Sequence, residues 1–468
     1  MPAFRLFTAC SAVEPRCRHG AGFARRRPWF ALCGLATGCL YIPESSVTDR
    51  VADTDTDADT DTDTNTDSDA EATWYADLDG DGSGDSSTAT LARTQPNGFV
   101  DNSWDCDDSD AGEPVWASTA VTGLGWLGTK VAPFALVQDA IAASTKCVRV
   151  EAGEYSENLN SLGKNLDIQG IAGSAATVVR PPAGGTVLTA SSSLALSVTG
   201  FTFTGGTGTL DANGGTQGGG IYATYANVTL TDVTLSFNSA TYGGGGIYAY
   251  SGEFVLTDVT FQENDAVSEG GGLRVIDLVL RGTRVRFLHN TATLGGAAEI
   301  LEGTTTLENL VVMGWQGHPE EDGLYIIGTS PGYTSEVTVI NGVFIDLDGA
   351  IRAGTAGDGT EFSSVSVVNT IFQSTGYAIT IDSNTTASMD YSDPWNALFI
   401  GVDTSEWVGN IDADPMLVDY TTGGDGSEDD LHLAEGSPCI DAGDPGILDG
   451  DGGPSDIGAY GGVNGSWD

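Results

Sequence analysis

The sequence has little positive charge. Its 468 residues include 18 Lys and Arg against 65 Asp and Glu, which gives a formal net charge of −47. A chain this acidic repels nucleic acid and anionic membrane surfaces, so we expect neither as a direct partner. The same charge favours solubility, cation binding and a location outside the cytoplasm.

Cysteine is also scarce, with seven residues in the chain. Three of them precede Cys39, and Cys39 itself lies in a segment with the features of an export signal. Only Cys106, Cys147 and Cys439 then remain for pairing, so at most one disulfide can form within the chain. This excludes a small fold held together mainly by disulfides, but it leaves open which two cysteines pair.

Glycine, by contrast, is abundant, and it marks an internal repeat. GGGIYA at 218–223 recurs at 244–249 and, loosened, as GGGLRV at 270–275, a spacing of 26 residues. Other positions keep this spacing, among them Asn238, Asn264 and Asn290. A repeat of this length indicates stacked supersecondary units, whereas a single phosphate-binding glycine loop would not recur at equal spacing.

Each period contains alternating Thr, Val, Leu and Phe segments typical of short strands, and the Gly, Asn and Asp turns between them leave no room for a helix. Each strand must therefore pair with its own copy one coil away, which predicts a parallel β-helix. Residues 26 apart then stack, so we expect an asparagine ladder of Asn238, Asn264 and Asn290 and a core stack that includes Phe261 and Phe287. FQEN (261–264) and FLHN (287–290), each followed by Gly-Gly and a hydrophobic residue, resemble the repeats of polymorphic outer-membrane proteins. The resemblance implies an all-β fold of the pectin-lyase-like class, a right-handed single-stranded parallel β-helix, over 117–468.

The two ends of this β-helix also have recognisable patterns. Residues 133–144 have helical spacing of apolar side chains, and the strand-like 147–159 follows. The pair looks like the capping helix and first coil of pectin-lyase-like proteins, and a cap protects the open edge of the first coil. Residues 412–462 resemble closing coils, and the length of 117–468 leaves room for about a dozen coils at this period. The acids there form either a second cation site or an acidic turn: Asp441, Asp444, Asp449, Asp451 and Asp456.

Residues 1–39 have the pattern of an export signal, in which Arg25 to Arg27 precede a short apolar run and small residues. With Cys39 after them, the segment looks like a bacterial lipobox. We therefore expect lipidation of Cys39 and an outer-membrane or cell-surface lipoprotein that contacts the membrane through this anchor alone. The alternative is secretion after an ordinary signal. The Asp/Thr-rich stretch at 40–72 is expected to be a disordered linker.

An acidic module is predicted at 73–116. The segment 74–85, WYADLDGDGSGD, has EF-hand spacing with Gly82 at position 6, but Thr88 replaces the usual Glu at position 12. A second cluster, WDCDDSD at 104–110, could supply further oxygens. Together the segments resemble the MopE-type metal-binding motif, although the first cysteine of that motif is missing near Arg93. Oxygen ligands favour Ca²⁺, so we expect a calcium site at Asp77, Asp79, Asp81, Ser83, Asp85, Asp105, Asp107, Asp108 and Asp110. The alternative is an acidic loop without an ion.

Four arginines lie close together within the third repeat: Arg274, Arg281, Arg284 and Arg286. In one interpretation they only stack on neighbouring coils, with Arg284 in a column below Asp232 and Asp258, and Arg274 below Tyr222 and Tyr248. In the other they form a catalytic site, because β-helix polysaccharide lyases use an Arg or Lys base with calcium. Arg281, Arg286 and Glu263 are then the candidate catalytic residues.

The sequence therefore favours a surface-anchored, calcium-stabilised β-helix that acts in binding, adhesion or envelope architecture. Its expected partner is a surface glycan or a protein ligand, and we expect a monomer. The alternative function is that of a polysaccharide lyase or glycoside hydrolase acting on an acidic polysaccharide. The residues that match the resembling families include no complete catalytic motif, so the first interpretation is preferred.

Overall fold

The computed structural model describes residues 71–106, 114–121, 127–315, 322–329, 333–355, 362–382, 384–420 and 429–466. The chain divides into two units, Met1–Thr66 and Asp67–Asp468, and every described residue belongs to the second. The predicted export signal, Cys39 and the linker up to residue 70 therefore lie outside the described residues.

The first described segment forms a small antiparallel sheet. Strand β1 (Ala72–Ala76) pairs on one side with β2 (Thr90–Ala92) and on the other with β3 (Phe99–Val100). A short 3-10 helix, η1 (Ser86–Thr88), precedes β2. The loop between β1 and η1 carries the predicted cation ligands, so the sheet holds both ends of that loop.

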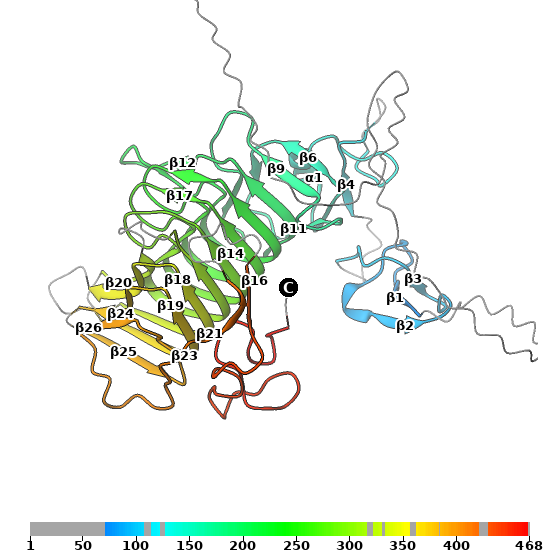
Figure 1. Cartoon of the computed structure of the whole chain (residues 1–468). Helices are drawn as coiled ribbons and strands as arrows, with labels where there is room; N and C mark the ends of the chain where they lie inside the picture. The colour runs from blue at the N-terminus through cyan, green and yellow to red at the C-terminus, as the bar shows by residue number, and fades with distance from the viewer. Residues whose placement is uncertain are drawn as a thin grey trace, which may run out of the picture. The chain divides into compact units, whose positions relative to one another are not determined.

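The rest of the chain forms a parallel β-solenoid of about 8 turns (Figure 1). This confirms the predicted all-β parallel β-helix. Nineteen strands make up its sheet: β4 (Val115–Ala117), β5 (Cys147–Val150), β6 (Gly153–Ser156), β7 (Leu159–Asn160), β8 (Leu166–Gly170), β9 (Thr177–Arg180), β10 (Leu188–Ser191), β11 (Leu196–Thr204), β14 (Ile221–Ser236), β16 (Ile247–Gln262), β18 (Leu273–Leu288), β19 (Ala298–Met313), β20 (Asp322–Gly328), β21 (Thr334–Ile345), β22 (Gly349–Thr355), β23 (Phe362–Gln373), β24 (Tyr377–Ile381), β25 (Thr385–Asp390) and β26 (Leu398–Ile400).

Three short strand pairs lie outside this sheet. They are the antiparallel pair β12 (Thr209–Leu210) and β13 (Thr216–Gln217), the parallel pair β15 (Ser239–Ala240) and β17 (Asp265–Ala266), and the antiparallel pair β27 (Leu417–Asp419) and β28 (Asp430–Leu433). The first two pairs lie in the turns between coils, and the third belongs to the C-terminal segment.

The repeat sets the register of the coils. Ile221 pairs with Ile247 and Ile247 with Leu273, as the 26-residue spacing predicts. The core stacks follow the same register: Phe261 and Phe287 are buried, with ring centroids 4.6 Å apart and an interplanar angle of 10°. From β18 to β19 the spacing shortens to 25 residues, because Leu273 pairs with Ala298.

The coils bend where residues other than glycine adopt left-handed backbone conformations. In the coil of β14 these are Tyr225, Asp232 and Phe237, with φ of 52°, 51° and 53°. Asp258 and Arg284 occupy the Asp232 corner in the next two coils, with φ of 55° and 54°. This conformation is unfavourable for most side chains, so the regular backbone ladder on both sides must compensate for its cost.

The predicted asparagine ladder is present and buried. The Nδ2 group of Asn238 donates to Oδ1 of Asn264 at 3.0 Å, and Nδ2 of Asn264 donates to Oδ1 of Asn290 at 2.9 Å. Each Nδ2 also donates to a backbone carbonyl, as that of Asn264 does to Leu235 at 2.8 Å. The side chains therefore satisfy one another inside the turn, where water does not reach them.

The glycines of the repeat allow the backbones of neighbouring turns to lie close together. Gly218, Gly244 and Gly270 have φ of 63°, 65° and 60°. A Cβ on Gly219 would lie only 2.4 Å from the carbonyl oxygen of Gly245. A side chain at that position would therefore push the coils apart, which explains the repeated glycine.

The capping helix is shorter than predicted. Helix α1 runs from Val137 to Ala143 and buries Val137, Ala140 and Ile141. Residues 133–136 are extended instead, because the backbone of Phe134 pairs with Trp116 and Ser118 of the first coil. Among the described residues, α1 is the only α-helix, and no helix there has the length and apolar character needed to cross a membrane.

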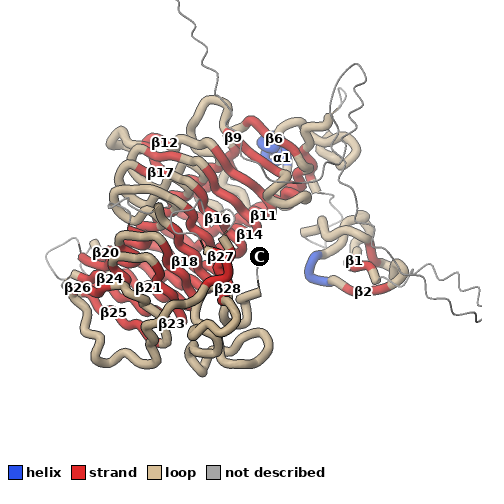
Figure 2. Tube along the Cα trace, viewed as in Figure 1, coloured by secondary structure: helices blue, strands red, loops and turns tan. Residues whose placement is uncertain are grey.

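The C-terminal segment does not add closing coils, which corrects the expectation of about a dozen. It leaves the stack after β26 and packs against the side of β19, β21 and β23 (Figure 2). There it forms a second apolar core: Val311, Met313, Val343, Ile345, Ile371, Leu431, Cys439, Ile457 and Ala459.

A change in one outward-facing column explains this packing. In the coils of β14, β16 and β18 the column contains Thr234, Thr260 and Arg286, which favour solvent. In the next coils it contains Val311, Val343 and Ile371. Burial of each such side chain stabilises the folded state by about 1.5–3 kcal/mol. The C-terminal segment therefore packs over the apolar part of this face.

Candidate functional site

The loop after β1 brings three predicted cation ligands together. One carboxylate oxygen from each of Asp77, Asp79 and Asp81 lies within 4.8 Å of the others. Backbone turns hold this arrangement: the amide of Gly80 donates to Asp77 at 2.8 Å, and that of Ser83 donates to Asp81 at 2.7 Å. Gly80 and Gly82 have φ of 81° and 89°, so glycine permits the sharp turn.

The carboxylates keep oxygens that the protein does not satisfy. One oxygen each of Asp79 and Asp81 accepts a backbone N–H bond, while Oδ2 of both side chains is buried without a hydrogen-bond donor among the described residues. Burial raises the pKa of Asp81, and the neighbouring Asp79 and Asp77 raise it further. These buried oxygens converge and repel one another. A hard cation such as Ca²⁺ would bind them and relieve that repulsion.

Three other described ligand candidates are not members of this carboxylate cluster, although the backbones of Asp85 and Asp105 pair with each other at the end of the loop. Asp85 caps η1 by accepting hydrogen bonds from the amide and hydroxyl of Ser87, and the buried Ser83 follows the three-carboxylate cluster. Asp105 is 5% exposed and belongs to a different group, beside Cys106 and Cys147. Asp107, Asp108 and Asp110 lie outside the described residues. The described cluster therefore consists of Asp77, Asp79 and Asp81.

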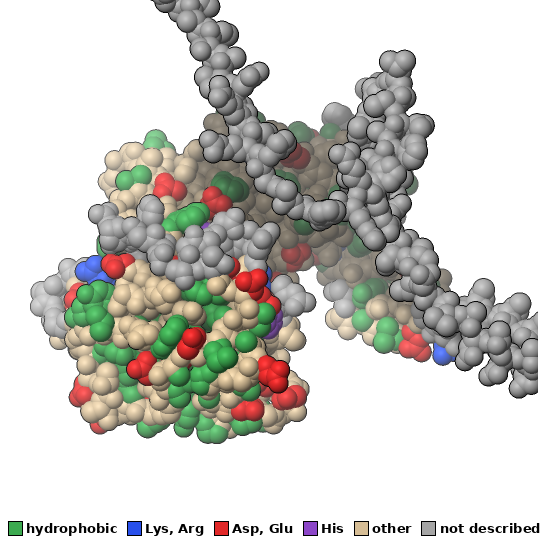
Figure 3. Space-filling model, viewed as in Figure 1, with side chains coloured by type: hydrophobic (Ala, Val, Ile, Leu, Met, Phe, Trp, Pro, Cys, Tyr) green, Lys and Arg blue, Asp and Glu red, His purple; other side chains and the backbone are tan. Residues whose placement is uncertain are grey.

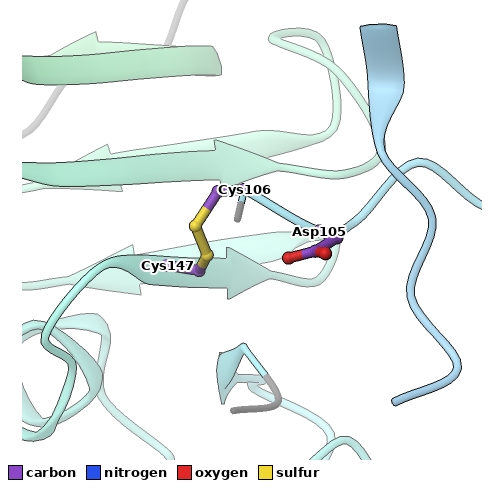
Figure 4. Close-up of side chains that lie close together, drawn as sticks. All are labelled: Asp105, Cys106 and Cys147. Carbon is purple, nitrogen blue, oxygen red and sulfur yellow. A yellow bond between two sulfur atoms is a disulfide. The ribbon is translucent and has the colours of Figure 1, made fainter. Parts of the chain in front are cut away.

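A disulfide joins the acidic module to the first coils of the solenoid. Cys106 bonds to Cys147 at the start of β5, with Asp105 beside the pair (Figure 4). Cysteines bonded to each other are not available as thiolate ligands, so this group is not a metal site. Cys439 is buried and free, and its Sγ lies 3.4 Å from Oδ2 of Asp393. Cys106, which lacks the local partner usual in the resembling motif, thus pairs with a cysteine of the solenoid.

Polar contacts strengthen this junction. The buried side chain of Arg149 donates to the carbonyl of Trp104 at 2.7 Å and pairs with Asp167 at 2.7 Å. Lys130 lies 3.3 Å from the ring centroid of Trp104, which contacts Trp116 edge-on. The cation–π contact of Lys130 and the hydrogen bond from Arg149 both hold the segment of Trp104 against the solenoid.

Three of the four clustered arginines form ion pairs with acids of nearby coils. Arg284 makes a two-point contact with Asp258, at 2.6 and 2.8 Å, as its place in the column predicts. Asp232 does not take part and instead accepts hydrogen bonds from Ser174. Arg281 pairs with Glu253 at an exposed position. These arginines therefore form ladder contacts with the coil above.

The three catalytic candidates occupy different positions on the coils. Arg286 is half-buried in the outward column that continues into Val311. Glu263 is exposed at a left-handed corner with φ of 50°. The proposed roles of Arg281, Arg286 and Glu263 remain predictions.

The most strongly perturbed charged cluster of the solenoid surrounds Arg274. Its guanidinium pairs through Nε with Glu299 and through Nη2 with Glu269, the latter at 2.6 Å. Arg274 and Glu299 are 6% and 2% exposed. Burial raises the pKa of Glu299 to about 7 despite the opposing effect of Arg274, and Glu269 raises it further. Two carboxyl groups that face one edge of a single guanidinium favour a shared proton.

Sequence reasoning missed Glu299. The signal was available, because Glu299 follows Tyr222, Tyr248 and Arg274 in the same outward column. The repeat shortens by one residue at this step, so a strict 26-residue spacing points to the neighbouring Ile300 instead. The predicted contact of Arg274 with Tyr248 is present, with Cζ of Arg274 at 5.7 Å from the ring centroid of Tyr248. The ring centroid of Tyr242 is closer, at 5.0 Å from the same atom.

The C-terminal segment encloses a cavity of about 430 Å³ against Ile371 of the solenoid. Its walls include Leu431, Ile457 and the stacked rings of His432 and Tyr460, whose centroids are 3.8 Å apart. Nearby acids accept hydrogen bonds from backbone amides. One example is Asp456, whose Oδ1 accepts from the amide of Asp441 at 2.8 Å. Burial raises the pKa of Asp456, and the neighbouring Asp449, Asp441 and Asp451 also raise it. The acidic turn and the second cation site both stay predictions.

No protein-family model and no curated protein sequence matches the chain. Among solved structures, pectin methylesterase from carrot is similar with a TM-score of 0.30 and 12% identity, over 65% of this chain and 90% of that one. Pectate lyase Pel9A is similar with a TM-score of 0.30 and 14% identity, over 74% and 96%. The A-module of the mannuronan C-5 epimerase AlgE6 from Azotobacter vinelandii has a TM-score of 0.23 and 15% identity, over 60% and 94%.

The strand pairing itself defines the class of the chain, a parallel β-solenoid. Similarity at this level carries no activity from those enzymes to this chain. Function must be argued from the sites on the solenoid and its N-terminal module.

Proposed function

We propose that the protein is a calcium-stabilised β-helix, exported and anchored at the cell surface, that acts in binding, adhesion or envelope architecture. Its ligand is a surface glycan or a protein. The observation that supports this proposal is the pairing of Arg274, Arg281 and Arg284 with carboxylates, a contact pattern typical of structural ladders between coils.

A lyase base must be able to give up its proton before it can accept one. The hydrogen bond with Asp258 raises the pKa of Arg284. Burial alone would lower the pKa of Arg274, but Glu299 and Glu269 outweigh it and raise that pKa. Both guanidinium groups therefore hold their protons more firmly than an ordinary arginine, so neither is suited to replace the candidates Arg281 and Arg286 as the base of a lyase.

The acidic module supports the calcium part of the proposal. Asp77, Asp79 and Asp81 converge, and the oxygens left without donors suit a hard cation. Few ligands on an exposed loop suit a Kd of about 10⁻⁴–10⁻³ M, which is the range of extracellular calcium modules. Calcium would fix the loop after β1 within the acidic module. The disulfide in turn joins this module to the solenoid.

Calcium titration of the full exported chain tests this proposal. Isothermal titration should show one site in the submillimolar to millimolar range, and Asp79→Asn with Asp81→Asn should abolish it. Asp403→Asn, in an exposed loop outside the cluster, is the matched control and should titrate like the wild type. Equal titration by the cluster variant and the control would contradict the proposed site.

One observation favours the alternative of a glycosidase or lyase. Glu269 and Glu299 form a carboxyl pair, and the pKa of Glu299 is about 7, which suits a general acid near neutral pH. Turnover of polygalacturonate and alginate should therefore be measured with the wild type, Glu299→Gln, and Arg281→Ala with Arg286→Ala. We expect no turnover. Turnover that is lost in the variants would establish an enzyme.

A further inference from the structure

The outward column that contains Arg274 has a distinctive set of polar groups. In successive coils it presents Tyr222, Tyr248, Arg274 and Glu299. Tyr242 and Glu269, from the turns between coils, lie beside it. We call these six residues the tyrosine–glutamate cluster. Successive members of the column are separated by the strand spacing of about 4.8 Å.

Charge within this cluster is already balanced or negative. Arg274 is its only described cation, and both Glu269 and Glu299 pair with it. Asp211, in the turn between β12 and β13, adds a further carboxylate that raises the pKa values of Tyr222 and Tyr248. An anionic ligand would therefore meet repulsion without a cation to offset it.

The hydroxyl groups of Tyr222 and Tyr248 are available to a ligand. The two rings stack at 5.3 Å with an interplanar angle of 16°, and both side chains are partly exposed. Among the described residues, neither phenol oxygen has a hydrogen-bond partner. Burial raises the pKa of both phenols, so they remain O–H donors at physiological pH.

Carboxylate acceptors flank these donors. Asp211 is held in place by Gln217 at 3.0 Å and by the amide of Gly215 at 2.9 Å. The side chain of Glu269 is about a fifth exposed, and its Oε2 forms an ion pair with Nη2 of Arg274 at 2.6 Å. Phenol donors beside fixed carboxylate acceptors match the alternating donor and acceptor character of sugar hydroxyl groups.

We propose that the tyrosine–glutamate cluster is a binding site for an uncharged glycan, recognised through its hydroxyl groups. This inference rests on the proposed binding function and specifies both the ligand class and the site. It also separates this chain from a protein that recognises acidic polysaccharides, because the cluster offers no unpaired cation to a sugar carboxylate. The net charge of −47 acts in the same direction.

Binding of the full exported chain to immobilised polysaccharides tests the proposal. The uncharged probes are xylan, mannan and mixed-linkage glucan, and the acidic probes are polygalacturonate and alginate. We expect binding to at least one uncharged glycan and little to the acidic ones. Tyr248→Phe and Glu269→Gln should each weaken binding about tenfold, the effect of losing one well-placed hydrogen bond.

Tyr333→Phe is the matched control, since this exposed tyrosine lies outside the cluster. Tyr248→Phe keeps the stacked ring, so it tests the hydroxyl without disturbing the coil, and thermal melting confirms the fold of each variant. Binding that persists unchanged in both variants would place the site elsewhere and leave the proposed function intact. A preference for acidic glycans would overturn the ligand class, and absence of binding to every probe would overturn glycan binding itself.

Discussion

Asn309 and Ala459 are 150 residues apart in the sequence, yet Nδ2 of Asn309 donates a hydrogen bond to the carbonyl of Ala459 at 2.8 Å. The same group donates to Gly461 at 2.7 Å. Asn309 occupies a left-handed corner of the solenoid, where earlier coils have Asp232, Asp258 and Arg284. The corner column thus changes from solvent-facing charges to amides that hold the C-terminal segment.

Asn309→Ala should loosen the C-terminal segment. The change removes two buried hydrogen bonds, so we expect a loss of about 1–3 kcal/mol in the free energy of unfolding. Urea unfolding measures the total, and hydrogen exchange in β28 reports the local effect. Asn213→Ala, in the exposed β12–β13 turn, is the control and should have little effect. Unchanged exchange in β28 would contradict the role of Asn309.

Asn264→Ala should be among the most destabilising single changes in the repeat. Its side chain accepts from the backbone and side chain of Asn238 and donates to Leu235 and Asn290. Breaking a buried network of this kind costs about 3–5 kcal/mol. Asn227→Ala, at an exposed position of the same repeat, should cost far less, and equilibrium unfolding in urea compares the two.

The cluster around Arg274 should make stability depend on pH. Burial raises the pKa of Glu299 to about 7, so the folded state binds a proton that the unfolded state, with a pKa near 4.5, releases. The contribution is therefore complete below about pH 4.5 and is lost as pH rises to about 7, by about 3 kcal/mol at most. Glu299→Gln should remove this slope. The difference between the two proteins, measured by unfolding at pH 5 and pH 7.5, isolates the effect from other acids.

Calcium affinity should fall on acidification. Burial and the neighbouring Asp79 and Asp77 raise the pKa of Asp81, so protons compete with the cation at a higher pH than they would for an isolated aspartate. Titrations between pH 7.5 and pH 5 should show progressively weaker binding and proton release on binding. An affinity independent of pH over this range would contradict a carboxylate site.

Reduction should destabilise the N-terminal end of the solenoid. The disulfide between Cys106 and Cys147 spans 41 residues, so its loss corresponds to about 4 kcal/mol in a chain-entropy model. Cys147→Ser, or dithiothreitol on the wild type, should lower the melting temperature, whereas dithiothreitol should not affect the variant further. Cys439 is buried and should resist alkylation until the protein unfolds, which provides an internal control.

Surface charge follows directly from composition. On the face drawn in Figure 3, acidic side chains are scattered among neutral ones, and few Lys or Arg side chains are visible. Three arginines of the third repeat, Arg274, Arg281 and Arg284, pair with nearby acids. This pattern limits the ligands that the described surface can attract.

The sequence by itself determined the repeating part of the fold. A strand that recurs at constant spacing has one possible neighbour, namely its own copy one coil away, so Ile221, Ile247 and Leu273 specify register without any tertiary information. The same logic predicted the asparagine ladder, the phenylalanine stack and the pair of Asp258 with Arg284. Local spacing likewise predicted the convergence of Asp77, Asp79 and Asp81, since all three lie within one turn.

Tertiary structure decided everything that joins distant parts of the chain. The pairing of Cys106 with Cys147 depends on how the module meets β5, which no local pattern encodes. The one-residue shortening of the repeat placed Glu299, not its neighbour, against Arg274. The C-terminal segment closes on Asn309 because an outward column becomes apolar only in the later coils, and an irregular segment has no period from which its partner could be predicted.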